Sequence, residues 1–412
     1  MSAVSSLDEA LQALMRLGSL MLRAGSAAFR VREWMEVVAP RLGIERLAVH
    51  ISVDGMVATG WRGREHATFA ADHGPPGIDA FRLGALERLA RDSKPDLTPQ
   101  AFAAELDAIF AAAPLRPAAM VALAVGVASG AFAYLNGGNP AGILAAFVAG
   151  GFGQYLRLLL LRGRLNQFAV TALCAAAASG LYTIAAMLLA GAGLPPLGAA
   201  GFIAAALFLV PGFPLVASLL DLIQHQTVAG LVRLGYAFFM LLAAALGLCV
   251  VAAIVPPDIV DASLPSPDAA TYLLRAVACF LGGAGFAILY NSSTRTVLAV
   301  GGLALVGNEL RLALHDHDLA LPLATLIGSL TVGLLASWVR PHLHEPRMAV
   351  TVPAIIIMVP GIYSFQAVVL FATGDAIGGL DAAVLAGFVL GAMAVGLAAA
   401  RFITQRKWRL EA

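Results

Sequence analysis

The chain of 412 residues is 60% hydrophobic and only 12% charged. A soluble domain carries roughly twice that share of charged residues, so the composition excludes a wholly soluble fold and indicates that much apolar surface faces lipid. The net charge of +1 hides a strong asymmetry, because the first 116 residues hold 27 of the 51 charged side chains. We therefore predict a polar head followed by a polytopic α-helical membrane body.

Several chemistries find no support in the sequence. The three cysteines, Cys174, Cys249 and Cys279, lie in apolar runs without the spacing of a metal site or a disulfide framework. No phosphate-binding loop of the G-x-x-x-x-G-K-[ST] type occurs. The first 24 residues mix charged side chains into the apolar positions, which is unlike a signal peptide. We expect no cofactor, no metal and no nucleic-acid partner.

Residues 1–113 are predicted to form a cytoplasmic α+β domain. Apolar side chains alternate with small or polar ones over residues 47–53, which is the period of a half-buried strand. Asp54-Gly55 is a hairpin signal, and stretches with helical spacing flank the hairpin on both sides. The expected elements are helices at about 5–24, 26–42, 79–93 and 98–112 and strands at about 47–53, 56–61 and 64–70.

An alternative of another class is a membrane-tethered hydrolase with a catalytic head. His50, Ser52 and Asp54 share one face of the first predicted strand. Successive members of a Ser-His-Asp triad must be in hydrogen-bond contact, whereas alternate residues of a strand stand about 6.5–7 Å apart. A half-buried strand has polar side chains on its solvent-facing side, which explains the presence of all three residues. We therefore expect that the protein is not an enzyme. A sensor head that gates a channel is a third interpretation.

Beyond a hinge at 114–117 the sequence contains ten apolar runs of membrane-spanning length. They divide into a first five-helix module at 114–255, an extracytoplasmic loop at 256–270, and a second five-helix module with a basic cytoplasmic tail at 271–412. The predicted spans lie at about 118–135, 141–161, 166–190, 197–215, 229–254, 271–290, 296–312, 319–338, 349–371 and 382–403.

The basic residues of the connections predict the orientation, because Lys and Arg stay on the cytoplasmic side. With the head inside, eleven basic residues fall on the cytoplasmic side and two outside. Both chain ends are then cytoplasmic, and an inner membrane is the expected location. The inside set is Arg157, Arg162, Arg164, Arg233, Arg295, Arg340, Arg347, Arg401, Arg406, Lys407 and Arg409, and the outside set is Arg275 and Arg311.

A Val-Pro-Gly phrase interrupts one apolar run in each half, at Pro211-Gly212 and at Pro360-Gly361. Proline removes a backbone donor and clashes with the preceding turn, and glycine relaxes the backbone further. At membrane depth, freed backbone groups are tolerated only where protein or enclosed water covers them. Matched interruptions predict the substrate site of a transporter built from two repeats, and five spans per repeat require the second repeat to be inverted.

A second pair of matched segments supports the repeat. Gly153-Gln154-Tyr155-Leu156-Arg157 resembles Gly307-Asn308-Glu309-Leu310-Arg311. The two amides could bind an amino-acid zwitterion where the halves meet, although interhelical hydrogen bonds worth about 0.6–2 kcal/mol explain them as well. The candidate substrate and ion-pathway residues are Gln154, Pro211, Gly212, Pro214, Asp221, Asn308, Glu309, Pro360, Gly361 and Gln366.

Asp221 is the only acidic residue between Asp107 and Asp258. An ionisable group within hydrocarbon costs about 3 kcal/mol or more, so it is retained for a purpose. Partial shielding from water raises the pKa of a carboxylate, which suits a residue that couples transport to protons. The alternative is that Asp221 is a helix cap at the cytoplasmic interface, and both interpretations stay open.

Several segments resemble the threonine/serine exporter family. The head matches its amino-terminal domain at L-R-A-G-S-A-A-F-R-V-R-E from Leu22 and at L-A-V-H-I-S-V from Leu47, and the body matches at N-G-G-N-P from Asn136 and at both Val-Pro-Gly phrases. The resemblance implies efflux of a small polar metabolite driven by an ion gradient. The expected function is export of threonine or serine by proton antiport, with dicarboxylate (succinate-like) export as the alternative. The expected partners are the small-molecule substrate, protons and the lipid bilayer, and a homo-oligomer is left open.

Overall fold

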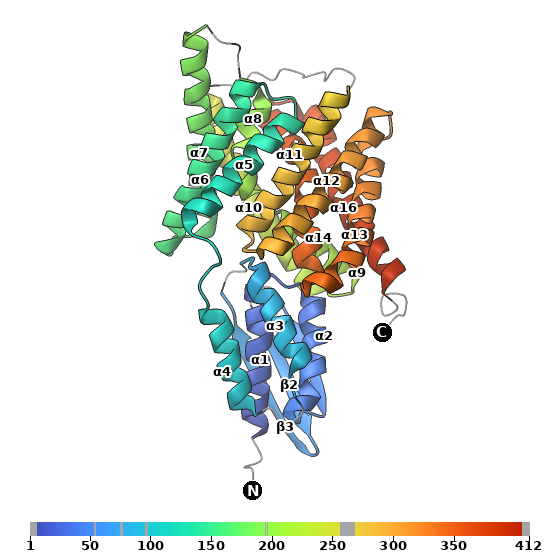
Figure 1. The fold of residues 1–412 in the computed structure, drawn as a ribbon. Coiled ribbons are helices and arrows are strands. Elements are labelled where there is room, and N and C mark those ends of the chain that lie inside the picture. The colour runs from blue at the N-terminus through green and yellow to red at the C-terminus, as the bar shows by residue number, and fades with distance from the viewer. Residues whose placement is uncertain are drawn as a thin grey trace.

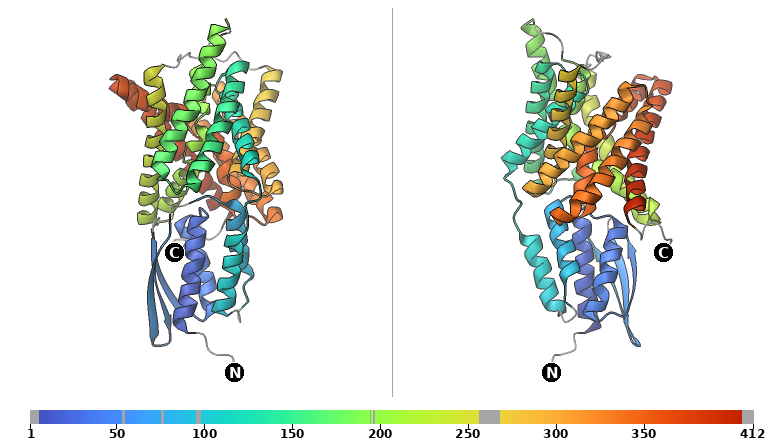
Figure 2. Two further views of the ribbon diagram at one scale, coloured as in Figure 1. Left: turned by 90° about the vertical axis from the view of Figure 1, so that its left-hand side faces the viewer. Right: turned by 45° about the vertical axis from the view of Figure 1, so that its right-hand side comes forward.

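The computed structural model describes residues 6–52, 55–74, 77–94, 98–193, 195, 197–255 and 268–405. Over these residues a head of helices and a small sheet lies at one end of a helical body (Figure 1). The views in Figure 2 show the head beyond the ends of the body's helices, with little overlap along the long axis. Most of the predicted loop 256–270 and the end of the predicted basic tail lie outside the described residues.

The head contains a three-stranded antiparallel sheet of order β1-β2-β3 and four helices. The strand register pairs Ile51 with Met56 in the first hairpin and Arg62 with Glu65 in the second. The elements lie within two residues of the ranges expected from the sequence, except that the second helix ends at Val38 and its last four predicted residues form a 3-10 turn. They are α1 Leu7–Arg23, α2 Ala28–Val38, the 3-10 turn η1 Ala39–Leu42, β1 Arg46–Ile51, β2 Gly55–Arg62, β3 Glu65–Asp72, α3 Ala80–Asp92 and α4 Pro99–Ala111.

Helix α1 provides the centre of the head's core. Ser6 caps its first turn by accepting a hydrogen bond from the Glu9 N–H group at 3.2 Å. Its apolar face is buried against the sheet and against α2 and α4. Gly18 lets α2 approach closely, because a β-carbon there would lie 2.8 Å from Met35 Sδ. The amphipathic stripe seen in the sequence is therefore the packing surface of the head.

The body consists of long helices and two interrupted ones. Side chains that precede the first turn cap several of these helices, as when Asn139 accepts from the Gly142 N–H group at 2.7 Å. The elements are α5 Ala118–Leu135, α6 Pro140–Arg162, α7 Gln167–Gly191, α8 Ala199–Ala204, the 3-10 turn η2 Leu207–Leu209, α9 Gly212–Ile223, α10 Thr227–Ile254, α11 Ala269–Leu289, α12 Thr294–Asp316, α13 Leu321–Leu343, α14 Arg347–Ile355, the 3-10 turn η3 Ile356–Met358, α15 Gly361–Thr373 and α16 Ala376–Thr404.

Eight helices of the described residues are long and apolar enough to cross a membrane, or nine if the bent pair formed by 347–358 and 361–371 counts as one span. That pair is bent by 52°. The sequence suggested ten spans. The difference lies at the predicted span 197–215, where the chain is divided into α8, η2 and α9, none long enough to cross alone. The protein is thus a polytopic α-helical membrane protein.

Polar contacts attach the head to one end of the body. The Ala80 N–H group donates to Tyr290 O at 2.9 Å, and Asn291 Nδ2 donates to Asp79 Oδ1 at 3.0 Å. Arg88 donates to the carbonyl oxygen of His344 at 3.3 Å. The turns α11–α12 and α13–α14 therefore lie on the head side, so α14 and α15 run away from the head.

Helices α5 and α11, the first of each half, pack closely against each other through small residues. A β-carbon at Gly285 would lie 2.7 Å from the Ala124 carbonyl oxygen and 2.9 Å from Ala128 Cβ. Lipid provides no hydrophobic force between helices, so helix association depends on close packing of small residues together with interhelical hydrogen bonds and lipid entropy. The contact at Gly285 therefore contributes to holding the two halves together.

We expect Gly285→Leu to separate α5 from α11 and to destabilise the protein, since overpacking typically costs about 1–3 kcal/mol. Gly302→Leu is the matched control, because a β-carbon at Gly302 meets no atom within 4 Å. Fluorescence-detected size exclusion and thermal unfolding in detergent measure the effect. Equal behaviour of the two variants would contradict the importance of this contact.

Candidate functional site

The two Val-Pro-Gly segments adopt the same backbone conformation. Pro211 has φ −78° and ψ 54°, and Pro360 has φ −79° and ψ 56°. The following glycine N–H group donates to the carbonyl oxygen two residues earlier at 2.8 Å in both halves, which is an inverse γ-turn. A 3-10 turn precedes each break and a helix begins directly after it. The repeated phrase thus encodes a repeated structure.

The two breaks contact each other inside the body. A β-carbon at Gly212 would lie 3.1 Å from Ile356 Cγ1 and 3.5 Å from Val359 Cγ2, and one at Gly361 would lie 3.7 Å from Leu207 Cδ1. All of these residues are buried. Each interruption is therefore covered by the protein of the opposite half, as an interruption at membrane depth requires.

The matched amides lie beside the breaks. Gly153 precedes Gln154, and a β-carbon at Gly153 would lie 2.8 Å from Phe208 Cζ of η2. Gly307 precedes Asn308, and a β-carbon at Gly307 would lie 3.1 Å from Met358 Cε of η3. Gln154 is 1% exposed, and its Oε1 atom has no hydrogen-bond partner among the described residues. Among the residues that the structure describes, no hydrogen bond joins Gln154 to Asn308.

Asn308 is fully buried and already engaged. Its Nδ2 group donates to Cys279 Sγ at 3.1 Å, and its Oδ1 atom accepts from Arg311 Nε at 2.8 Å. Glu309 follows on the same helix, half-buried, and neither of its carboxylate oxygens has a hydrogen-bond partner among the described residues. The second half therefore places a buried, engaged amide next to the residue that contacts η3, and a half-buried carboxylate one residue further along α12.

Pro214 lies in the first turn of α9 and Gln366 lies half-buried on α15. Both follow their break within about two turns, so they belong to the same region as the two phrases. The Gln366 side chain makes no hydrogen bond with any residue that the structure describes. Pro214 and Gln366 thus lie on the helices that begin at Gly212 and Gly361.

Asp221 lies on the last turns of α9 and is fully buried where the head meets the body. Its Oδ1 atom accepts from the Phe29 N–H group at 3.2 Å. Helix α2 has no side-chain cap of its own, so a carboxylate from the body satisfies a free donor at its N-terminus and faces the positive end of its dipole. The predicted span ended at residue 215, whereas the helix continues past Asp221 to Ile223.

Arg233 on α10 completes this contact, which we call the head–body joint (Ser26, Phe29, Asp221 and Arg233). Its Nε atom lies 3.6 Å from Asp221 Oδ2, and its Nη2 group donates to the Ser26 carbonyl oxygen at 2.9 Å. Both side chains are more than nine-tenths buried. The two facing atoms make no hydrogen bond with each other, so the pair is a charge contact. Removing one partner of a buried ion pair typically costs about 3–5 kcal/mol, because the other charge is left uncompensated.

Sequence reasoning used the arginines only to orient the chain and missed their structural contacts. Arg233, Arg347 and Arg401 are 3–6% exposed inside the protein. These contacts could have been predicted from an arginine within or at the end of an apolar run, since a charge placed there needs a partner or a functional reason. For the triad considered in the head, His50 is exposed on β1, and Asp54 lies outside the described residues.

A helical body with many apolar helices of membrane-spanning length and two buried, matched helix breaks is the architecture of many membrane transporters. Residues 12–255 match the threonine/serine exporter model ThrE, and residues 275–403 match the model described as Threonine/Serine exporter, ThrE. The first match covers more than half of the 412 residues. The chain therefore belongs to the threonine/serine exporter family.

Two curated relatives carry the name "Probable succinate transporter subunit YjjP". The Escherichia coli (strain K12) protein is 35% identical over 138 residues, which is 32% of this chain and 52% of the relative. The Klebsiella aerogenes protein is 33% identical over 138 residues, covering 32% and 51%. The chain spans about half the length of these relatives. No solved structure matches it.

Glu345 lies in the connection between α13 and α14 and contacts the head. It is 7% exposed, and its Oε2 atom would lie 2.3 Å from a β-carbon at Gly84 of α3. Burial raises the pKa of Glu345 to about 7, with nearby Arg88 lowering the pKa and Glu87 raising it. Because this pKa exceeds the ordinary 4.5, the folded protein holds a proton that the unfolded chain releases between the two values.

We therefore expect stability to fall as pH rises from about 4.5 to about 7 and to stay low above that range. Glu345→Gln keeps the neutral form at every pH. It should raise the midpoint of thermal unfolding by several degrees at about pH 8 and leave it nearly unchanged at about pH 5. Glu105→Gln, at an exposed position on α4, is the control. A Glu345→Gln midpoint that follows the wild-type pH profile would contradict the assignment.

Proposed function

We propose that the protein is a secondary active exporter of a small polar metabolite, with threonine or serine as the first candidate and proton antiport as the mechanism. The observation that carries the proposal is the contact between two equally shaped helix breaks at Pro211-Gly212 and Pro360-Gly361. Interrupted helices that meet inside the membrane form the substrate site in many transporters with repeated halves.

Helix ends supply the chemistry for a carboxylate substrate. Helices α9 and α15 both begin at the breaks, so the free N–H groups of their first turns and the positive ends of their dipoles converge on the contact. An amino acid and a dicarboxylate both present a carboxylate to such ends. Gln154 and Glu309, each with an unsatisfied oxygen, are proposed to hold an ammonium or hydroxyl group, with Pro214, Asn308 and Gln366 lining the route.

The two halves are proposed to be inverted copies. Helices α6 and α12 each have 23 residues, and their positions differ by a constant 154 residues. From the breaks onward the offset is 149 residues, because the connection before α8 is longer than the one before α14. The interrupted helix α8–α9 runs toward the head and α14–α15 runs away from it. Counting α8–α9 as a span would give ten.

We further propose that residues 1–113 are a cytoplasmic domain, that 114–255 and 271–412 are the two membrane modules, and that both termini are cytoplasmic in an inner membrane. The concentration of arginines on the head side of the body supports this orientation. Cysteine labelling at Arg164→Cys and Asp318→Cys tests it. Only the second position should react with an impermeant reagent added outside the cell.

Dicarboxylate export is the second candidate, favoured by the name of the two relatives. The expected result in vesicles with an imposed pH gradient is saturable movement of either threonine and serine or a C4-dicarboxylate, abolished when the gradient is collapsed. Pro211→Ala and Pro360→Ala should each reduce the rate at least tenfold, because a regular helix removes the free helix ends. A wild-type rate in both variants would exclude the breaks as the transport site.

Asp221 is proposed as the proton-coupling residue, and Asp221→Asn tests this. Asparagine can still accept from the Phe29 N–H group but stays neutral, so gradient-driven efflux should be lost while exchange of labelled for unlabelled substrate persists. Arg233→Gln, which removes the other half of the ion pair, is the matched comparison and should keep its response to the gradient. If both variants lose stability and transport alike, Asp221 serves only the head–body joint, and Glu309 becomes the next candidate.

A further inference from the structure

Two arginines lie at matched positions of α6 and α12, each one helical turn beyond the glycine that faces a 3-10 turn. Arg157 follows Gly153 by four residues, and Arg311 follows Gly307 by four residues. Because α6 runs toward the head and α12 runs away from it, Arg157 lies closer to the head than the contact of Gly153, and Arg311 lies further from the head than the contact of Gly307. The two arginines therefore lie toward opposite sides of the membrane from the proposed transport site.

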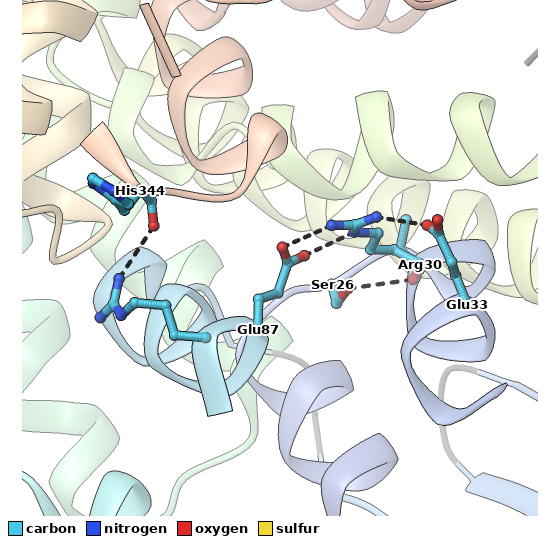
Figure 3. A network of polar contacts seen from close by, with 7 residues as sticks. Ser26, Arg30, Glu33, Glu87 and His344 are labelled. Atoms are coloured by element: carbon cyan, nitrogen blue, oxygen red, sulfur yellow. Dashed lines mark hydrogen bonds and ion pairs between the residues drawn. The ribbon is translucent and has the colours of Figure 1, made fainter. Parts of the chain in front are cut away.

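Other arginines of low exposure are paired with carboxylates. In the head, Arg30 Nε donates to Glu87 Oε1 at 2.9 Å, and Arg30 Nη1 donates to Glu33 Oε2 at 2.6 Å (Figure 3). In the body, Arg275 donates to Asp316. An ionisable side chain within a membrane protein is costly, and it is retained where it has a partner or a function. An arginine of the body without a carboxylate partner is thus a candidate for function.

Arg157 has no such partner. Its half-buried side chain makes no hydrogen bond or ion pair with any residue that the structure describes. The titratable groups near its guanidinium are Cys174 of α7, Tyr236 of α10 and Tyr290, which follows α11. Cys174 and Tyr290 are buried, so the guanidinium points into the protein and not toward lipid. Tyr290 in turn packs against Phe213, the residue after the first break, with ring centroids 5.8 Å apart.

Arg311 has only a neutral partner among the described residues. Its Nε atom donates to Asn308 Oδ1 at 2.8 Å, and Asn308 is itself held by Cys279. Tyr363 of α15, two residues after the second break, lies near its guanidinium. The two Nη groups make no hydrogen bond in the part of the chain that the structure describes. They form the end of a planar fork that matches the two oxygens of a carboxylate.

The two halves differ at one matched contact. Asn308 accepts from the arginine three residues after it. Gln154 holds the same position relative to Arg157, and side chains three residues apart on a helix can meet. However, the buried Gln154 Oε1 atom has no partner among the described residues. A buried acceptor that lacks its donor is costly, so the open contact in the first half indicates a place that a ligand completes.

We propose that Arg157 and Arg311 bind the carboxylate of the transported solute in turn, Arg157 on the head side and Arg311 on the opposite side. This inference rests on the proposed function. Each guanidinium fork binds one carboxylate, and the amide three residues earlier holds the arginine when no solute is bound. In the structure Arg311 is held and Arg157 is not, so Arg157 is the arginine ready to bind. An amino acid and a dicarboxylate both present the group that such a fork recognises.

The test compares KM on the two sides of the membrane, with labelled threonine, serine and succinate as probes. Inside-out vesicles present the head side to the medium, and right-side-out vesicles present the opposite side. Arg157→Gln should raise KM at least tenfold in inside-out vesicles and less than twofold in right-side-out vesicles, because glutamine cannot make the charged, paired hydrogen bonds. Arg311→Gln should show the reverse. Arg157→Lys and Arg311→Lys keep the charge without the fork and should give intermediate values.

A binding measurement tests the same assignment without transport. At least one of threonine and succinate should raise the midpoint of thermal unfolding of the purified full-length protein in detergent, whereas its methyl ester should not. Arg157→Gln should lose this response. Arg162→Gln is the matched control, because Arg162 is an exposed arginine at the end of the same helix, and it should keep the wild-type KM and binding. A response to threonine alone assigns an amino-acid substrate, and one to succinate alone assigns a dicarboxylate.

The inference is overturned if both glutamine variants raise KM equally on the two sides, as a purely structural role would. It is also overturned if the methyl esters bind as tightly as the acids, or if no probe binds or is transported. Transport with the wild-type KM in both variants would remove the arginine assignment and leave the proposed function standing. Binding that is lost in Arg157→Gln, in a protein that moves no solute along a gradient, would support the arginine site and contradict the proposed function.

Discussion

The structure depends on how two interrupted helices satisfy their backbone inside a membrane. Each break at Pro211 or Pro360 frees polar backbone groups that lipid cannot bind, and each is covered by the segment that contains the other break. Neither half can therefore be stable in lipid with its break uncovered. The small residues between α5 and α11 also help to cover the breaks, because they allow the two halves to approach until the breaks are in contact.

Helix α9 connects this central contact to the head. It begins at Gly212 against the opposite break and carries Asp221 near its other end, roughly 14 Å away at the rise of an α-helix. Asp221 accepts from the first turn of α2 and pairs with Arg233, which also binds the backbone of the head at Ser26. Any rearrangement that displaces α9 at the break must therefore displace or strain the attachment of the head. The same carboxylate can serve attachment and coupling, because both depend on its charge.

Local patterns in the sequence were enough to predict the interrupted helices and the elements of the head. A Pro-Gly pair interrupts the helix at its own position, and the alternation over residues 47–53 predicts a strand over those same residues. The partners of Asp221 could not be predicted in this way, since Phe29 and Arg233 approach it only after the head has docked, and Phe29 is 192 residues away along the chain. The fourth predicted span was interrupted as expected but ended too early, at residue 215, whereas α9 continues to Ile223.

Three arginines of the body lie at the surface that the head covers. Arg340 and Arg401 lie near the last residues of α13 and α16, and Arg347 is the first residue of α14, which leads directly to the second break. Burying these charges costs free energy, and Glu33 and Glu87 of the head lie close enough to Arg340 and Arg401 to offset part of that cost. Helix α9 leads from the break at Pro211 to Asp221, and α14 leads back from the break at Pro360 to Arg347, so both breaks connect to the end of the body that holds the head.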